Sequence, residues 1–479
     1  MMWKYIFYEI KSLLKTSKIR IIFFLILIMT IVTAFDNYQK SKTEEIYGLT
    51  YLKENYDELE LDEWGIDVDV SMGSITTEEE KLYRSKIEEW RNIIKKGIKA
   101  AEEKDWKTYN EMSLLNGVYE YKLTQNYTYR YADTYKDEYH YYTQYNDEVE
   151  RIIKKRGLSD IEVPDISNMK DDLNYQTNAA LSLNGYIDAQ YAVRLFDVLL
   201  DKDISPINHY QVDSVSIFFH TFNEIIPFIG LILVCILGFD MISRDKETGV
   251  IKTIISSPKM RKRYIISKSI ISSIISIIVL LLPTFFISLC LGLFDKFKMF
   301  YYPTLTFIDG LHSFDLAFNN IAGMEYMVDA RRMYSSVHYS GLVRHSLYGG
   351  DSMSWTALRA PDMSLDYISL GLFLLFALIL FAVFIIFLNS LTMCINLFVK
   401  SKTLGLCFTV IICLVGYVTT PIENTAWANI LNPFSYKNAV EVVAGTSSYP
   451  FFAGIIILLV YICLLQIIGR LTMRKKDMV

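Results

Sequence analysis

The stretch LDYISLGLFLLFALILFAVFIIFLNSLTMCINLFV, residues 365–399, contains one charged side chain, that of Asp366. A helix needs about 20 apolar residues to cross the roughly 30 Å hydrocarbon core of a bilayer. Because this stretch exceeds that length, it predicts a membrane-spanning helix. It places the chain among integral membrane proteins and not among soluble domains.

Further apolar stretches predict that the chain crosses the membrane six times. Hydrophobic residues make up 52% of the chain, which exceeds the apolar share of an ordinary soluble domain. The predicted spans are residues 19–37, 214–240, 264–294, 365–399, 403–420 and 450–471. The first span could instead be a signal peptide, but no small-residue cleavage site follows it, which favours an uncleaved anchor.

Charge divides the chain into two kinds of segment. Between Asp36 and Ser214 there are 37 acidic and 22 basic residues. Since the whole chain has 53 acidic and 48 basic residues, the remainder has 53 − 37 = 16 acidic and 48 − 22 = 26 basic residues. The basic residues flank the spans and do not form one soluble patch, so the pattern does not indicate a nucleic-acid partner.

The basic flanks also predict the orientation of the chain. Cytoplasmic segments next to a span carry an excess of Lys and Arg. Residues 241–263, the turn at Lys400 and Lys402, and both ends of the chain are basic. Six spans with both termini in the cytoplasm place every one of these basic segments on the cytoplasmic side of the membrane. The composition, rich in Lys, Ile and Tyr, suggests a bacterial source and hence a bacterial cell membrane.

This orientation places three segments outside the cell. Residues 38–213 form a large domain, residues 295–364 a second insert, and residues 421–449 a shorter outer segment. Apolar residues at helical spacing over residues 78–107 predict that the large domain is mainly helical.

A tyrosine-rich part of the large domain gives a weaker signal. Tyr127, Tyr129 and Tyr131 alternate as residues of a strand do. These and neighbouring tyrosines either form an aromatic surface for a peptide or sugar, or pack between long helices. Packing is favoured.

The ends of the chain are also predicted to lie in the cytoplasm. Residues 1–18 carry apolar side chains at helical spacing with lysines on the other sides, which is typical of an amphipathic helix lying in the membrane interface. Residues 472–479 form a short basic tail after the last span.

No motif for catalysis or metal binding is visible in the sequence. It lacks the phosphate-binding loop of ATPases, the paired histidines of zinc proteases and the serine elbow of hydrolases. The six cysteines lie in apolar stretches, which favours packing over redox or metal chemistry. They are Cys235, Cys290, Cys394, Cys407, Cys413 and Cys463. We therefore expect no enzyme activity, no cofactor and no metal in this chain.

Two short motifs lie in the segments between spans. In the loop after the second span, Glu247 and Gly249 precede two isoleucines and Pro258, and Arg261 and Lys268 follow. Proline disfavours helix at the residue before it, so a short amphipathic helix would end there. Such a helix suits docking to a cytosolic partner, although an ordinary loop held on anionic lipid is the simpler alternative.

The second motif lies between the fifth and sixth spans, in the sequence Asn432-Pro433-Phe434-Ser435-Tyr436. Together with the loop motif, the six spans and the N-terminal helix, it resembles the type-2 ABC exporter permeases. The chain departs from their pattern at Val250, where the family has Thr, and in having isoleucines in place of leucines. The resemblance does not cover residues 38–213.

The resemblance implies an all-α polytopic fold of the type V ABC exporter class, with an N-terminal interfacial helix. It implies that two permease halves, identical or homologous, pair with two cytosolic ABC ATPase subunits that bind ATP and Mg. It assigns Glu247, Gly249, Pro258, Arg261 and Lys268 to the coupling interface with the ATPase. It assigns Asn432, Pro433 and Tyr436 to an outer re-entrant element.

Polar residues inside the second span form a further candidate site. His220, Asn223 and Glu224 lie within it, and His220 and Glu224 share a helix face because they are four residues apart. A charged side chain near the middle of a bilayer costs about 2.5–3.5 kcal/mol on insertion scales. The three side chains either line a substrate path or pair with one another.

These patterns favour a permease subunit that exports a substrate, with a peptide or antimicrobial compound as the substrate class. The alternative is a multi-span sensor whose outer domain binds a ligand and signals to a cytosolic protein. An intramembrane enzyme ranks last because no paired catalytic residues lie at matched depth.

Overall fold

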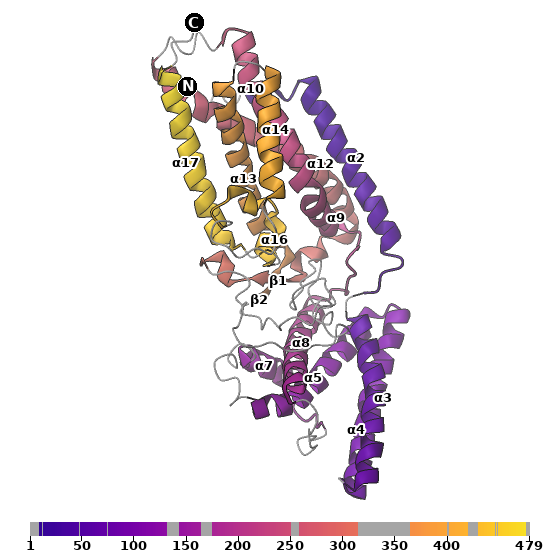
Figure 1. The fold of residues 1–479 in the computed structure, drawn as a ribbon. Helices are drawn as coiled ribbons and strands as arrows, with labels where there is room; N and C mark the ends of the chain where they lie inside the picture. Colours follow the sequence, from indigo (N-terminus) through magenta and orange to yellow (C-terminus); the bar gives the residue numbers. More distant parts are fainter. Residues whose placement is uncertain are drawn as a thin grey trace.

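The computed structural model describes most of the chain. The described residues are 9–11, 13–46, 48–73, 75–131, 143–163, 175–250, 258–314, 365–399, 402–419, 430–445, 447 and 449–475. They form a bundle of long apolar helices and a separate helical domain at one end of it (Figure 1). We call the end of the bundle that carries this domain the domain end, and the opposite end, where α10 finishes at Glu247, the loop end.

Five helical stretches in the described residues are long and apolar enough to cross a membrane. They are α2 (Ser17–Lys40), the combined helix Ser214–Glu247, the stretch Tyr264–Asp295 of α12 (Pro258–Asp295), α13 (Leu370–Phe398) and Phe451–Met473 of α17 (Phe451–Lys475). The chain is therefore a multi-pass membrane protein.

The predicted span at 403–420 is the exception. Its helix, α14 (Lys402–Val418), has 17 residues, which at 1.5 Å per residue makes it about 25 Å long. That is shorter than the roughly 30 Å hydrocarbon core. The prediction of six spans is thus supported for five, and α14 packs beside them on α10 and α13.

The second span occupies the centre of the bundle. In its most apolar window 71% of the residues are buried, against 22% in α2 and 28% in α17. Helices α2, α14 and α17 instead expose rows of large apolar side chains. These three helices therefore present surfaces suited to lipid or to another membrane chain, while the second span is enclosed by protein.

The second span is not a regular α-helix. It begins as α9 (Ser214–His220), continues as the π-helix η2 (Thr221–Gly230) and returns to α-helix in α10 (Leu231–Glu247). Pro227 lies within η2, and a proline in a helix removes one backbone hydrogen bond and crowds the preceding turn. The π-helical segment follows from this local disruption, and π-helical turns are frequent at functional sites.

The helical domain confirms the prediction of a mainly helical insert. It contains α3 (Leu49–Met72), α4 (Thr77–Glu102), α5 (Trp106–Tyr131), α7 (Asn146–Arg156) and α8 (Tyr175–Lys202). Trp90 of α4 stacks on Tyr119 of α5 with 5.7 Å between ring centroids and donates to Asn116 Oδ1 at 2.8 Å. Tyrosine packing between helices therefore accounts for this part of the tyrosine-rich segment.

The strand-like alternation of Tyr127, Tyr129 and Tyr131 was a wrong indication. These residues belong to the last turns of α5. Alternation of one residue type over five positions is too short to distinguish a strand from a helix, since a long helix that starts earlier can continue through it.

Strands β1 (Pro303–Phe307) and β2 (Leu365–Ser369) form a two-stranded antiparallel sheet at the domain end of the bundle (Figure 1). The sequence analysis did not predict it. The sheet moves the start of the fourth helix to Leu370, five residues after the predicted boundary of 365, and Ser369 caps that helix by accepting from Leu372 N at 3.4 Å.

Arg194 joins the helical domain to this sheet. Its side chain, 5% exposed, pairs with Glu148 at 2.7 Å and with Asp366 of β2. Its guanidinium carbon stands 3.8 Å from the centroid of the Tyr145 ring. Because β2 leads directly into α13, this contact anchors the domain to the fourth span.

Candidate functional site

The loop end of the second span carries the residues predicted to contact an ATPase. Glu247 is the last residue of α10 and is exposed. Gly249 has φ of +73°, a left-handed conformation that glycine adopts without strain. Residues 251–257, which include the predicted short amphipathic helix, lie outside the described residues. Pro258 is the first residue of α12 and Arg261 lies in its first turn.

Lys268 lies inside the bundle. Its side chain is 1% exposed, and its Nζ pairs with Asp245 Oδ2 at 2.8 Å and with Glu9 Oε1. Tyr264 donates to the same Asp245 oxygen at 2.7 Å. The assignment of Lys268 to a partner-facing surface therefore does not fit this position. Lys268 ties together the N-terminal segment, the second span and the third.

Lys246 makes a second connection at the loop end. Its Nζ donates to Asn396 O at 2.6 Å and to Val399 O at 3.4 Å, at the carboxyl end of α13. A cation is favourable there because helix carbonyls carry partial negative charge. Asn396 donates in turn to Phe239 O at 2.9 Å. The second span is thus bonded to the fourth across several polar groups.

Polar side chains also link α12, α13 and α17 within the bundle. Ser269 and Ser390 lie 3.0 Å apart at their hydroxyls, and Gln466 donates to Ser390 at 3.1 Å. Asn389 Oδ1 accepts from Ser272. Such contacts hold membrane helices together, since lipid supplies no hydrophobic force between them.

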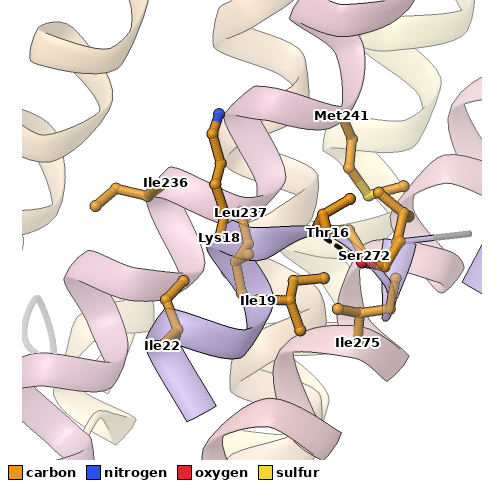
Figure 2. A pocket seen from close by; sticks show the side chains of 10 residues that line it. Thr16, Lys18, Ile19, Ile22, Ile236, Leu237, Met241, Ser272 and Ile275 are labelled. Carbon is orange, nitrogen blue, oxygen red and sulfur yellow. Dashed lines mark hydrogen bonds between the residues drawn. The ribbon is translucent and has the colours of Figure 1, made fainter. Parts of the chain in front are cut away.

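A small pocket opens between the start of α2 and the second and third spans (Figure 2). It lies beside the turn at residues 14–16 that separates the N-terminal segment from α2. Its lining is mostly aliphatic, with Lys18 and Ser272 as its polar members besides Thr16. No polar groups converge in it, so we do not assign a substrate site there.

The motif between the fifth and sixth spans forms a compact element at the domain end. Asn432 Oδ1 accepts from Phe434 N at 3.0 Å and so caps the 3₁₀ helix η6 (Pro433–Tyr436). Tyr436 is fully buried and donates to Ile430 O at 2.9 Å. The short helix α16 (Ala439–Ala444) follows and packs on α13. The motif residues thus have structural roles within the chain.

Two glycines let this element pack tightly against its neighbours. A Cβ at Gly454 of α17 would stand 2.5 Å from Tyr436 Cδ1, and one at Gly416 of α14 would stand 2.3 Å from Phe434 Cδ2. Real Cβ atoms do not approach that closely, so the aromatic rings of η6 occupy the space that these glycines leave.

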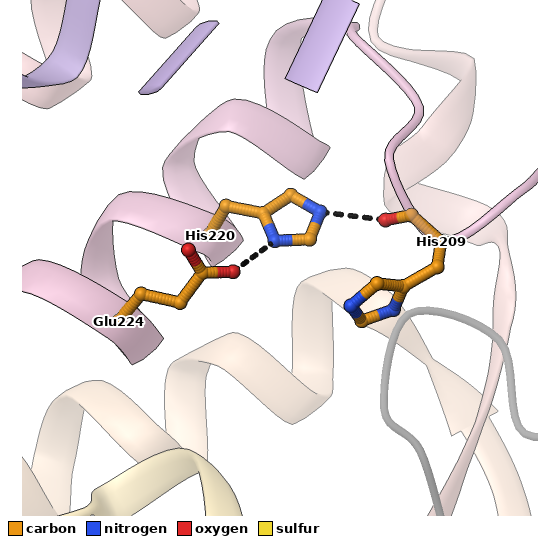
Figure 3. Close-up of side chains that lie close together, drawn as sticks. All are labelled: His209, His220 and Glu224. Atoms are coloured by element: carbon orange, nitrogen blue, oxygen red, sulfur yellow. Dashed lines mark hydrogen bonds and ion pairs between the residues drawn. The ribbon is translucent and has the colours of Figure 1, made fainter. Parts of the chain in front are cut away.

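A polar cluster lies at the domain end of the second span (Figure 3). His220 Nδ1 lies 2.8 Å from Glu224 Oε1, and His220 Nε2 lies 2.8 Å from the backbone oxygen of His209. Of the two alternatives that the sequence left open, the structure shows the pairing for His220 and Glu224. Asn223 lies beside them, and its buried Oδ1 has no hydrogen-bond partner among the described residues. A role in a substrate path stays a prediction.

Sequence reasoning missed His209. It lies eleven residues before His220, in the segment that joins the helical domain to the second span. Ring contact places it beside His220, with centroids 5.3 Å apart and planes at 89°. No spacing rule points to such a residue, because a non-helical connection brings it back to the helix.

A family model described as ABC-2 family transporter protein matches residues 7–478. The chain belongs to the ABC-2 transporter family. It is therefore a membrane permease component of an ABC transporter, and the resemblance predicted from the two motifs is confirmed. No curated protein and no solved structure matches the chain significantly.

The family match extends over nearly the whole of this ABC-2 protein, including the helical domain between the first and second spans. The expectation that the resemblance does not cover residues 38–213 was therefore wrong, because the family model matches them as well. The family membership gives a transport role to the bundle. It does not by itself assign a role to any single side chain.

Proposed function

We propose that this ABC-2 protein is the permease subunit of an exporter whose ATPase subunits dock on the loop end of the bundle. The loop end, with both termini, faces the cytoplasm of a bacterial cell in this proposal, and the helical domain lies outside. ATP and Mg are bound by the partner chain. A second copy or a homologue supplies the other half.

One observation supports this role above the others: the loop end of the second span is bonded to the third span, to the fourth span and to the N-terminal segment. Lys246 bonds it to the fourth span, and Lys268 bonds it to the third span and to the N-terminal segment. A displacement of the loop after Glu247 would therefore be transmitted to several helices at once. Interfaces of this kind change between discrete packings and do not deform continuously.

The exposed residues next to Gly249 suit the docking surface. Glu247, Thr248 and Val250 are all exposed at the loop end. They combine a carboxylate, a hydroxyl and an apolar group over a few residues, which gives a partner both charge and contact area. A peptide or antimicrobial compound is the substrate class we propose for transport.

Purification of the tagged chain from its own host in mild detergent tests the proposal. We expect a cytosolic ATPase to co-purify in stoichiometric amount and the complex to hydrolyse ATP. Glu247→Lys should weaken both. Glu103→Lys is the matched control, since Glu103 is 62% exposed on the helical domain and far from the loop end.

Each result has a clear meaning. Co-purification that Glu247→Lys abolishes and Glu103→Lys preserves would support docking at the loop end. Equal losses in both variants would contradict it. A pure chain with no ATPase, also after chemical cross-linking in the membrane, would favour the alternative of a sensor.

A further inference from the structure

The cluster of His209, His220 and Glu224 has a geometry that a simple ion pair does not require. Each residue offers one ligand atom, and these atoms lie within 4.8 Å of one another. Figure 3 shows the three side chains converging from the linker and the second span. We propose that they bind a divalent transition-metal ion, with Zn²⁺ as the best chemical match, at the domain end of the second span.

The hydrogen bonds of His220 orient it as a ligand. The backbone oxygen of His209 can only accept, so the contact at 2.8 Å requires a proton on His220 Nε2. In the neutral ring the lone pair is then on Nδ1, which faces Glu224 Oε1 at 2.8 Å. Two lone pairs at that distance need a cation between or beside them. A metal ion satisfies this need, as does a second proton on the ring.

The third ligand distinguishes a metal from a proton. A proton shared by His220 and Glu224 needs nothing more, whereas zinc favours four ligands drawn from imidazole nitrogen, carboxylate oxygen and water. The His209 ring supplies the additional nitrogen. Two histidines, one glutamate and a water form a recurrent zinc set, and the bond from His220 to a backbone carbonyl is the support that ligating histidines usually have.

Small side-chain movements would complete the site. With zinc–ligand bonds of about 2.0–2.2 Å, ligand atoms of a tetrahedral ion stand about 3.3 Å apart. The present spread, up to 4.8 Å, closes if Glu224 and His209 rotate. The Glu224 side chain is 47% exposed and His209 is half-buried, while His220 is fully buried. The exposure of Glu224 also gives an ion a way in.

The position of the cluster gives the ion a mechanical effect. His209 belongs to the segment arriving from the helical domain, and His220 and Glu224 flank the start of the π-helix η2. A bound ion would cross-link that segment to the second span where its helix is irregular. A ligand that binds one arrangement better than another shifts the population toward it. The metal would therefore stabilise one position of the second span relative to the domain.

A substitution at Lys40 of α2 is expected to strengthen metal binding, in contrast to the ligand substitutions, which weaken it. Its ammonium interacts electrostatically with Glu224, pairs with Asp36 at 2.7 Å and lies 5.2 Å from the centroid of the Tyr210 ring. Like charge opposes a dication, so Lys40→Gln should bind metal more tightly than the unchanged protein, by about threefold to tenfold for a screened interaction of roughly 0.6–1.4 kcal/mol.

Metal binding by the purified full-length protein tests the inference without any transport assay. The protein carries a tag without histidine, is stripped with a chelator and is titrated with Zn²⁺ against a competing chromophoric chelator in detergent. We expect one tight ion per chain. His209→Ala and Glu224→Gln should each weaken binding at least tenfold.

His312→Ala is the matched control, because His312 is 67% exposed and faces Asp309 at 3.8 Å, with no third candidate ligand beside them in the part of the chain that the structure describes. It should leave the tight ion in place. Thermal unfolding of each metal-free variant checks that the fold is kept. If the unchanged protein binds zinc no more tightly than the variant carrying both His209→Ala and Glu224→Gln, the cluster is a proton-sharing pair and the inference is wrong.

Discussion

Replacing Lys268 by methionine tests the ion cluster at the loop end. The change keeps an unbranched side chain but removes the ammonium that pairs with Glu9 and Asp245. Glu9 then keeps only the more distant guanidinium of Arg244, at 3.9 Å, among the ion pairs of the described residues. Glu9 is 6% exposed and Asp245 is 5% exposed. Removing one partner of a buried ion pair costs about 3–5 kcal/mol, because the remaining charge stays buried without compensation.

The expected loss in the free energy of unfolding is therefore about 3–5 kcal/mol, a factor of roughly 10² to 10³·⁵ in the equilibrium between folded and unfolded protein. The hydrogen bond from Tyr264 to Asp245 remains and favours the lower part of that range. Unfolding by sodium dodecyl sulfate in mixed micelles, followed by tryptophan fluorescence, measures it. Lys15→Met removes an equal charge from an exposed position at the same end and should cost under about 0.5 kcal/mol.

A combined variant separates charge from packing. If stranded carboxylates cause the loss, adding Glu9→Gln and Asp245→Asn to Lys268→Met should recover a large part of it, because neutral amides are cheaper to bury than carboxylates. A single variant that costs less than about 1 kcal/mol, or a combined variant that recovers nothing, would refute the reasoning and show that the cluster is open to water.

Three further predictions concern other parts of the chain. Gly454→Ala should lower stability by about 1–3 kcal/mol, because the added Cβ would stand 2.5 Å from the Tyr436 ring; thermal unfolding in detergent measures it, and an unchanged midpoint would mean that η6 packs loosely. Arg194→Met should leave the carboxylates of Glu148 and Asp366 without this cation and loosen the helical domain from β2. Hydrogen exchange of β2 and α8 should therefore accelerate, while α17 stays protected. A cysteine at Glu103 should react with a membrane-impermeant maleimide in intact cells and one at Thr248 only after lysis; the reverse pattern would overturn the proposed orientation.

The sequence predicted the features of this protein that depend on composition over long stretches. The apolar span predicted at residues 365–399 and the helical insert follow from apolar length and helical periodicity, and the structure has them as α13 (Leu370–Phe398) and the helical domain. Where a short pattern was used, the prediction was weaker. Tyr127 to Tyr131 alternate over too few positions to exclude helix, and the strand at 365–369 has five residues that merge with the following apolar run.

The missed and misplaced site residues share one physical cause. The family resemblance assigned Lys268 to the coupling interface, but its charge is buried beside Glu9 and Asp245. Its position depends on Glu9, which is 259 residues away along the chain. His209 likewise meets His220 through a non-helical linker. Partners that approach only through the tertiary fold leave no periodic signal in a single sequence.

The two ends of the second span carry polar clusters, and the packing of this span explains their position. A span whose most apolar window is 71% buried is held by neighbours mainly through apolar contact, which has little directional preference. Directional contacts fix the height of the span along the membrane normal: Lys246 and Asp245 at the loop end, and His220 with the backbone oxygen of His209 at the domain end. A helix whose two ends are set by separate polar contacts, with a π-helical segment between them, can change one end without unfolding the other. Such an arrangement is what a transporter needs if a cytosolic event and an outer ligand are to act on the same helix.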